Sequence, residues 1–220
     1  VLRLRNSISG TVLTAHGLVD RPGQRDRPVS VPYRSTRIVR FRAGAAGTYS
    51  YWGTTSGRHV SDGVGRDSEL SGAIVVDPAG SKPDMRNDRI FVIGNWINLI
   101  DPNGVPVRRY ELLTINGKAW PYTERLSYPQ GTIVHWRWVN TSGAEHPMHL
   151  HGFYFRVDSR GDGIANVDYR NADRDVEVTE LLPSGGTFAM TWSADRPGNW
   201  LIHCHIPFHQ RAHLPIADML

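Results

Sequence analysis

Short stretches of this chain alternate between hydrophobic and polar residues, which is the period of a β-strand with one buried face. The clearest are residues 1–5, 36–42, 132–140, 186–192 and 199–205, which are rich in β-branched and aromatic side chains. Gly, Pro, Asn and Asp separate them at intervals of roughly 8 to 12 residues, a spacing typical of β-sandwiches and Greek-key barrels. The pattern therefore predicts an all-β fold.

A polar, proline-containing segment divides the chain into two unequal parts. Residues 77–84 read DPAGSKPD, a composition typical of an interdomain linker. Residues 1–6 resemble residues 134–140, which favours two related sandwiches. The expected parts are a first domain over residues 1–78, a linker over 79–84 and a second domain over 85–220. Because the first domain is short, we expect the chain to be a piece of something longer.

Composition excludes several function classes. Hydrophobic residues make up 40% of the 220 positions, enough for a sizeable core. The net charge is +4, but the arginines are dispersed among acidic residues, so no basic stripe predicts a nucleic-acid partner. Apolar runs fall short of the ~20 residues that cross a bilayer, so we expect no membrane span. A single cysteine, Cys204, excludes an internal disulfide framework.

Most of the ten histidines lie in two short segments, HPMHLHG at residues 146–152 and HCHIPFH at residues 203–209. Alternate residues of a strand share a face, so His203 and His205 point away from Cys204. The second segment therefore offers a thiolate on one face and a pair of imidazoles on the other.

The two faces predict two metal sites. A thiolate and two imidazoles in a trigonal arrangement are the donors of a blue-copper electron-transfer site, and His146, Cys204 and His209 fit that set. Zinc accepts the same donors, but structural zinc sites usually have four ligands and more thiolates. Half of a second site, made only of imidazoles, is expected from the other face: His149, His151, His203 and His205.

Together the two segments resemble the C-terminal copper motifs of the multicopper oxidases, the laccase-like cupredoxin proteins. The resemblance implies two cupredoxin-like Greek-key β-sandwich domains with copper as the cofactor, and it makes Cys204, His203 and His205 the electron path between sites. Its ligand assignment is His146, Cys204 and His209 on type 1 copper, His149 on type 2 copper, and His151, His203 and His205 on the type 3 pair.

The axial position of the type 1 site lies further along the chain. Leu214 stands ten residues after Cys204, where the family usually has Met, Leu or Phe. We expect Leu214 to occupy this position without coordinating the metal, and Met219 is the alternative if the loop is longer. A leucine would raise the copper potential, whereas a methionine would lower it.

The first half resembles the family's N-terminal domain but departs at its ligands. The family's His-x-His-Gly reads Thr14-Ala15-His16-Gly17 here, and Trp52 and Thr54 stand where the family has two further histidines. A lone histidine in a turn is usually structural, and we interpret His16 in that way. Another domain or a second copy of the chain is therefore expected to complete the trinuclear cluster, unless the cluster is incomplete.

The resemblance implies a copper-dependent oxidoreductase that takes single electrons from phenol-like or metal-ion donors and passes them to dioxygen. It also implies an extracytoplasmic location. The alternative is a non-catalytic blue-copper electron carrier or copper-binding protein, which the missing first-domain histidines favour. A structural protein that inherited the motifs is a third interpretation.

Four tryptophans are expected in the sandwich core: Trp136, Trp138, Trp192 and Trp200.

Overall fold

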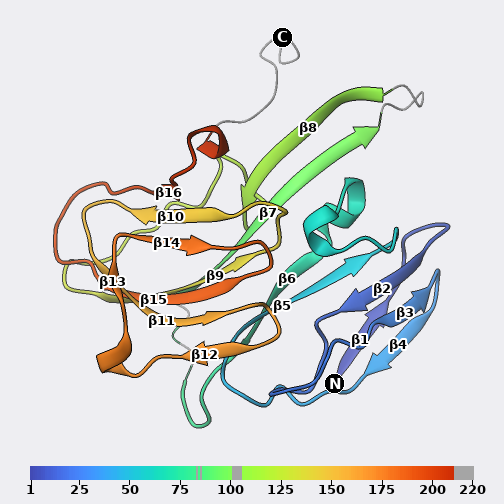
Figure 1. The fold of residues 1–220 in the computed structure, drawn as a ribbon, viewed down its shortest axis with the longest axis horizontal. Helices are drawn as coiled ribbons and strands as arrows, with labels where there is room; N and C mark the ends of the chain where they lie inside the picture. Colours follow the sequence, from blue (N-terminus) through green and yellow to red (C-terminus); the bar gives the residue numbers. More distant parts are fainter. Residues whose placement is uncertain (83, 85, 101–105, 211–220) are drawn as a thin grey trace.

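The computed structural model describes residues 1–82, 84, 86–100 and 106–210, and these form β-strands joined by loops and short 3₁₀ helices (Figure 1). The prediction of an all-β protein is confirmed. Within the described ranges, no helix has the length and apolar character needed to cross a membrane. The 3₁₀ helices are η1 (Val60–Asp62), η2 (Gly65–Glu69), η3 (Asn171–Asp173) and η4 (Pro207–Gln210).

The first 76 residues form the N-terminal unit, which contains a two-stranded and a four-stranded sheet (Figure 1). All of its strand pairs are antiparallel. Ala15, Leu18 and Val39 form its small apolar core. The smaller sheet pairs β1 (Leu2–Arg5) with β4 (Thr36–Val39), and the larger has the order β3 (Val29–Pro32), β2 (Val12–His16), β5 (Gly47–Thr54) and β6 (Ser71–Val76).

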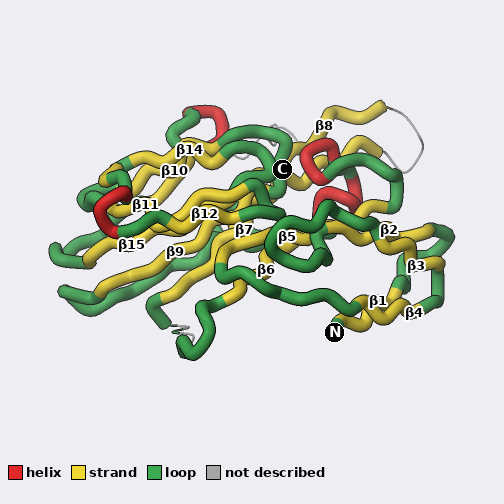
Figure 2. Tube along the Cα trace, turned by 60° about the horizontal axis from the view of Figure 1, so that its bottom comes forward, coloured by secondary structure: helices red, strands yellow, loops and turns green. Residues whose placement is uncertain are grey.

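The C-terminal unit packs a three-stranded sheet over a seven-stranded one, as Figure 2 shows for β10 and β14 above β9, β11 and β15. The smaller sheet has the order β14 (Thr179–Leu182), β10 (His146–Leu150) and β16 (Ile202–Cys204). The larger has the order β12 (Asn166–Asp168), β11 (Phe155–Gly161), β15 (Thr187–Ser193), β9 (Ile133–Asn140), β7 (Asp88–Ile100) and β8 (Pro106–Ile115), with β13 (Val176–Glu177) beside β11.

The two sheets bury an aromatic core because β9 alternates as its sequence predicts. Trp136 and Trp138 face the core, while His135, directly before Trp136, is exposed and bonds Thr191. Trp192 from β15 lies against Trp136, with ring centroids 5.0 Å apart. The prediction of core positions is therefore confirmed for these three tryptophans.

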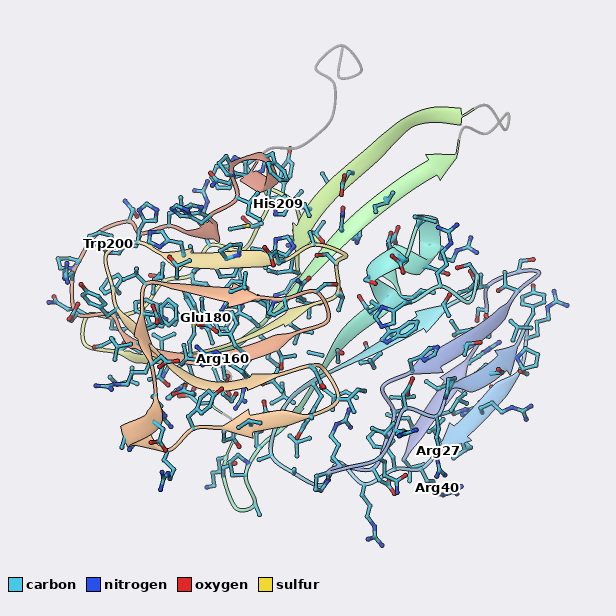
Figure 3. All side chains as sticks on the ribbon, viewed as in Figure 1. Arg27, Arg40, Arg160, Glu180, Trp200 and His209 are labelled. Atoms are coloured by element: carbon cyan, nitrogen blue, oxygen red, sulfur yellow. The ribbon has the colours of Figure 1, made fainter. Side chains whose placement is uncertain are left out.

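The same prediction is wrong for Trp200, which is 45% exposed (Figure 3). Trp200 lies in the loop before β16, where it packs over the edge of the sandwich and not inside it. Its ring packs on Phe153 and on the backbone of Gly152, where an added Cβ would come within 2.4 Å of the ring. The glycine has φ +80°, so both its conformation and its lack of a side chain are needed there.

Polar contacts through β5 join the two units. The amide of Ser50 donates to the carbonyl of Gly163 at 2.9 Å, and Thr187 Oγ1 donates to the carbonyl of Thr48 at 3.2 Å. Arg137 of β9 forms ion pairs with Asp77 and Asp88, the residues just after β6 and at the start of β7. The division of the chain at residues 79–84 stays a prediction.

A buried carboxylate closes the end of β5 in the N-terminal unit. Asp67 of η2 is 5% exposed and accepts hydrogen bonds from the hydroxyls of Thr54, Thr55 and Ser56 at 2.6 to 2.7 Å. It also accepts from the amides of Thr55 and Ser56. Burial alone raises the pKa of this carboxylate, but the hydrogen bonds outweigh it and lower the pKa from 3.8 to about 2.

We expect Asp67→Asn to lower the free energy of unfolding at neutral pH by about 2 kcal/mol, the equivalent of that pKa change. Because the folded-state pKa is depressed, this stabilisation is complete above the unfolded pKa of 3.8 and is lost as the pH falls through about 2. Chemical denaturation of both proteins from pH 7 to pH 2 should show the difference shrinking. The exposed Asp62→Asn is the control, and an equal loss in that variant would contradict a specific role for Asp67.

Candidate metal centre

Three donor side chains meet at the end of the three-stranded sheet of the C-terminal unit, and we call them the thiolate group: His146, Cys204 and His209. His146 begins β10, and Cys204 ends the neighbouring β16. His209, labelled in Figure 3, lies in η4, the next element after β16. One ligand atom from each residue lies within 4.8 Å of those of the other two. Cys204 Sγ is 3.4 Å from His209 Nδ1. Cys204 and His209 are only five positions apart, but His146 lies 58 positions before Cys204. The fold therefore brings a distant donor to a local pair.

Electrostatics prepare these donors for a cation. Burial, together with the adjacent His209 ring, lowers the pKa of His146 to about 4, so this imidazole is neutral at pH 7 and keeps a lone pair. Burial raises the pKa of the Cys204 thiol, while the amide of Ile206 opposes that effect. A bound cation is therefore needed to hold the thiolate form, which couples loss of the thiol proton to metal binding. A soft thiolate with two imidazoles fits copper.

Four histidines gather on the other side of β10 and β16, in these strands or directly after them, and we call them the imidazole group: His149, His151, His203 and His205. Neighbouring ring centroids lie 4.8 to 5.8 Å apart. His151 Nε2 and His203 Nε2 are 3.0 Å apart, so the two ring nitrogens can share a proton or a metal ion. The alternation of β10 explains the separation of faces, because Met148 and Leu150 on either side of His149 are buried.

Backbone and hydroxyl oxygens orient the rings of the imidazole group. His149 Nδ1 lies 2.9 Å from the carbonyl oxygen of Val178 and 2.7 Å from the hydroxyl of Thr179, which leaves Nε2 for a ligand. His203 Nδ1 donates to the carbonyl oxygen of Cys204 at 2.8 Å, which also leaves Nε2. Hydrogen bonds of this kind fix the tautomer of metal-binding histidines.

The bond from His203 also connects the two groups. The sequence indicates only a covalent connection, because His203 and His205 flank Cys204. The structure adds a hydrogen bond from the His203 ring to the Cys204 backbone, which bypasses part of that covalent route. The sequence contains no signal for this contact, since it depends on the rotamer of His203.

An apolar pocket of about 330 Å³ opens beside the thiolate group. His209, Cys204 and His146 form part of its wall. Other parts of the wall come from β7, β8 and the loop after β8, and neither the period nor the motifs of the sequence indicate them: Ile93, Leu113, Ile115, Trp120 and Thr123.

The positions of the N-terminal unit that depart from the family motif also lie together. Thr14 of β2 is paired with Thr54 of β5, and His16 with Trp52. The His16 ring stacks on Trp52 at 3.7 Å, and its Nδ1 lies 2.6 Å from a carboxylate oxygen of Asp26. The His16 ring therefore has both a stacking partner and a hydrogen-bond partner within the N-terminal unit.

The two alternatives for the axial position, Leu214 and Met219, lie outside the described residues. The structure therefore gives no test of that prediction. The individual assignments to type 1, type 2 and type 3 copper also stay predictions, although the structure brings the residues of each predicted set together.

A sheet-end thiolate with two imidazoles on a cupredoxin-type sandwich defines a copper-binding class of protein. A sequence profile of the family described as "Multicopper oxidase" matches residues 97–216. The chain therefore belongs to the multicopper oxidase family, whose cofactor is copper. This confirms the resemblance drawn from the two histidine segments.

Individual relatives agree with the family match. Laccase-3 of Botryotinia fuckeliana is 35% identical over 123 residues, which are 47% of this chain and 26% of that protein. The iron transport multicopper oxidase fio1 of Schizosaccharomyces pombe is 30% identical over 135 residues, which are 58% of this chain and 21% of that protein. The chain thus spans about a quarter or less of the length of these curated relatives.

The solved structure of the multicopper oxidase mgLAC shares the fold. It superposes with a TM-score of 0.72 at 23% sequence identity, covering 96% of this chain and 68% of that one. The prediction of cupredoxin-like β-sandwich domains is confirmed by this similarity together with the observed sheets.

Proposed function

We propose that the chain is part of a laccase-like oxidase in which the thiolate group holds a type 1 copper and the imidazole group supplies half of a trinuclear copper centre. Copper bound at these groups would supply one-electron chemistry, with oxidation of a small donor at the first and reduction of dioxygen to water at the second. The observation that carries this proposal is the position of Cys204, whose side chain joins one group and whose backbone accepts a hydrogen bond from the other.

The residues of the two faces have different roles in this proposal, donor binding on one face and copper binding by imidazoles on the other. The pocket beside His209 offers an apolar wall against which a phenol-like ring can pack, close to a histidine of the thiolate group. A metal-ion donor is the other candidate, which the iron transport role in the name of the fission yeast relative supports. On the opposite face, the imidazole group presents the ring nitrogens of His149 and His203, whose rings are held by carbonyl and hydroxyl oxygens.

The rest of the trinuclear centre has to come from outside the C-terminal unit in this proposal. His16 is engaged by Trp52 and Asp26, and Thr14 and Thr54 offer no imidazole. A further domain or a second copy of the chain would supply the missing donors, and symmetric association is an economical way to repeat one interface. An extracytoplasmic location, as the family resemblance implies, is part of the same proposal.

Copper content measured against oligomeric state tests this proposal. We expect the isolated monomer to hold blue copper at the thiolate group, and additional copper to bind only when an assembly completes the imidazole group. Light scattering after size exclusion, combined with metal analysis of each peak, gives both quantities. A monomer with a full set of type 2 and type 3 copper would contradict completion by another subunit. A single copper per chain in every assembly state would support the electron carrier instead.

A further inference from the structure

A buried polar network holds the side of His146 that faces away from the thiolate group. Ser142 Oγ lies 2.8 Å from His146 Nε2. Both residues are 2% exposed, so water does not compete for this contact. Ser142 stands in the short loop between β9 and β10, and Asn140 at the end of β9 is fully buried beside it. The protonation of the His146 ring is therefore set by protein groups.

The amide orientation of Asn140 follows from its partners. Its Nδ2 lies 2.7, 3.2 and 2.9 Å from the carbonyl oxygens of Ala144, Leu182 and Pro183. Carbonyl oxygens only accept hydrogen bonds, so the atom facing them has to be the nitrogen. The opposite atom, Oδ1, then faces the amide of Ser142 at 2.9 Å and its hydroxyl at 2.8 Å.

This orientation determines the direction of the Ser142 hydroxyl. An oxygen–oxygen contact of 2.8 Å is a normal hydrogen bond only if one oxygen carries the proton, and Oδ1 cannot. Ser142 therefore donates to Asn140 Oδ1. The carbonyl of Ala144, 3.2 Å from the same hydroxyl, would also take its proton and leave the same result. In both cases the hydroxyl has only a lone pair to offer to His146 Nε2, and that nitrogen has to carry a hydrogen.

We propose that Asn140 and Ser142 are positioning residues that fix His146 as the Nε2–H tautomer and so present its bare Nδ1 to the metal of the thiolate group. The identity of that metal rests on the proposed function, whereas the tautomer does not. A metal binds an imidazole only through an unprotonated nitrogen, so the other tautomer would place an N–H against the cation. The chain of bonds runs from three backbone carbonyls through Asn140 and Ser142 to the ring.

Nitrogen-15 NMR of the histidine rings in the metal-free protein tests the proposal without copper. The two ring nitrogens of a neutral imidazole differ in chemical shift according to which carries the proton, and a His146→Gln spectrum assigns the signal. We expect the Nε2–H tautomer in the wild-type chain. The Nδ1–H tautomer in the wild-type chain would overturn the proposal, whether or not any variant folds.

Two serine variants then separate the hydroxyl from the loop that carries it. In Ser142→Ala we expect the Nδ1–H form to become populated and the copper affinity to fall by roughly 10- to 100-fold, the usual effect of losing such a partner. Ser184→Ala is the matched control, because its hydroxyl donates to the backbone carbonyl of Ser142 at 2.6 Å and does not contact the ring. An unchanged tautomer in Ser142→Ala, or an equal change in Ser184→Ala, would overturn the proposal. A wild-type chain with the expected tautomer but no affinity for copper would support this network and reject the proposed function.

Discussion

Replacing Cys204 with serine is expected to abolish the intense visible band of the copper-loaded protein and to lower its copper content by one ion per thiolate group. The band arises from charge transfer between a thiolate sulfur and copper, and Cys204 is the single cysteine of the chain. Serine keeps the size of the side chain but its hydroxyl does not ionise at neutral pH. Absorption spectra and metal analysis of both proteins after the same copper loading give the result.

The control for this substitution replaces a histidine that belongs to neither group. His135 is exposed on β9, and its ring bonds the hydroxyl of Thr191. His135→Ala should therefore leave the band and the copper content unchanged. A Cys204→Ser protein that keeps the band would remove Cys204 from the site, and a band lost equally in His135→Ala would point to a general effect on folding.

Two histidine variants, one in each group, should produce reciprocal defects. His209→Ala removes an imidazole of the thiolate group, so we expect the blue band and donor oxidation to be lost while the imidazole group still binds metal. His205→Ala removes a ring of the imidazole group, whose centroid lies 5.2 Å from that of His149. The blue band should persist in this variant and bleach with a reductant, but air should no longer restore it.

Anaerobic reduction followed by exposure to air, monitored at the blue band in the assembled protein, measures these defects. The parent protein should recover its colour, and the His205→Ala protein should recover it at least roughly tenfold more slowly, in line with the loss of a metal-binding partner. Recovery at the parent rate in His205→Ala would show that dioxygen is not reduced at the imidazole group. That outcome would favour the electron carrier over the oxidase.

The site could be predicted from the sequence because its donors lie close together in two segments. The period of two places Cys204 on one face and its two neighbours on the other, and β10 separates His149 from Met148 in the same way. The pairing of Met148 with Cys204 and of His149 with His203 then brings the segments into register. Local alternation and one strand pair therefore define both groups.

The parts that sequence could not predict depend on contacts between distant loops. The tautomer of His146 is set through Asn140 by carbonyls of residues 182 and 183, which are more than 40 positions away. Trp200 has the same hydrophobic character as the core tryptophans, and its exposed position follows from the loop that carries it and from the bare backbone of Gly152. Residue type and period contain no information about either contact.

The most direct measurement of the central claim is anomalous X-ray diffraction at the copper absorption edge from crystals of the assembled, copper-loaded protein. We predict one copper peak among His146 Nδ1, Cys204 Sγ and His209, and further copper density beside the ring nitrogens of His151 and His203 that lie 3.0 Å apart. Data collected below the copper edge and at the zinc edge identify the element. Absence of copper from the thiolate group in a fully loaded crystal, or a zinc peak there after copper loading, would contradict the claim that Cys204 connects two copper sites.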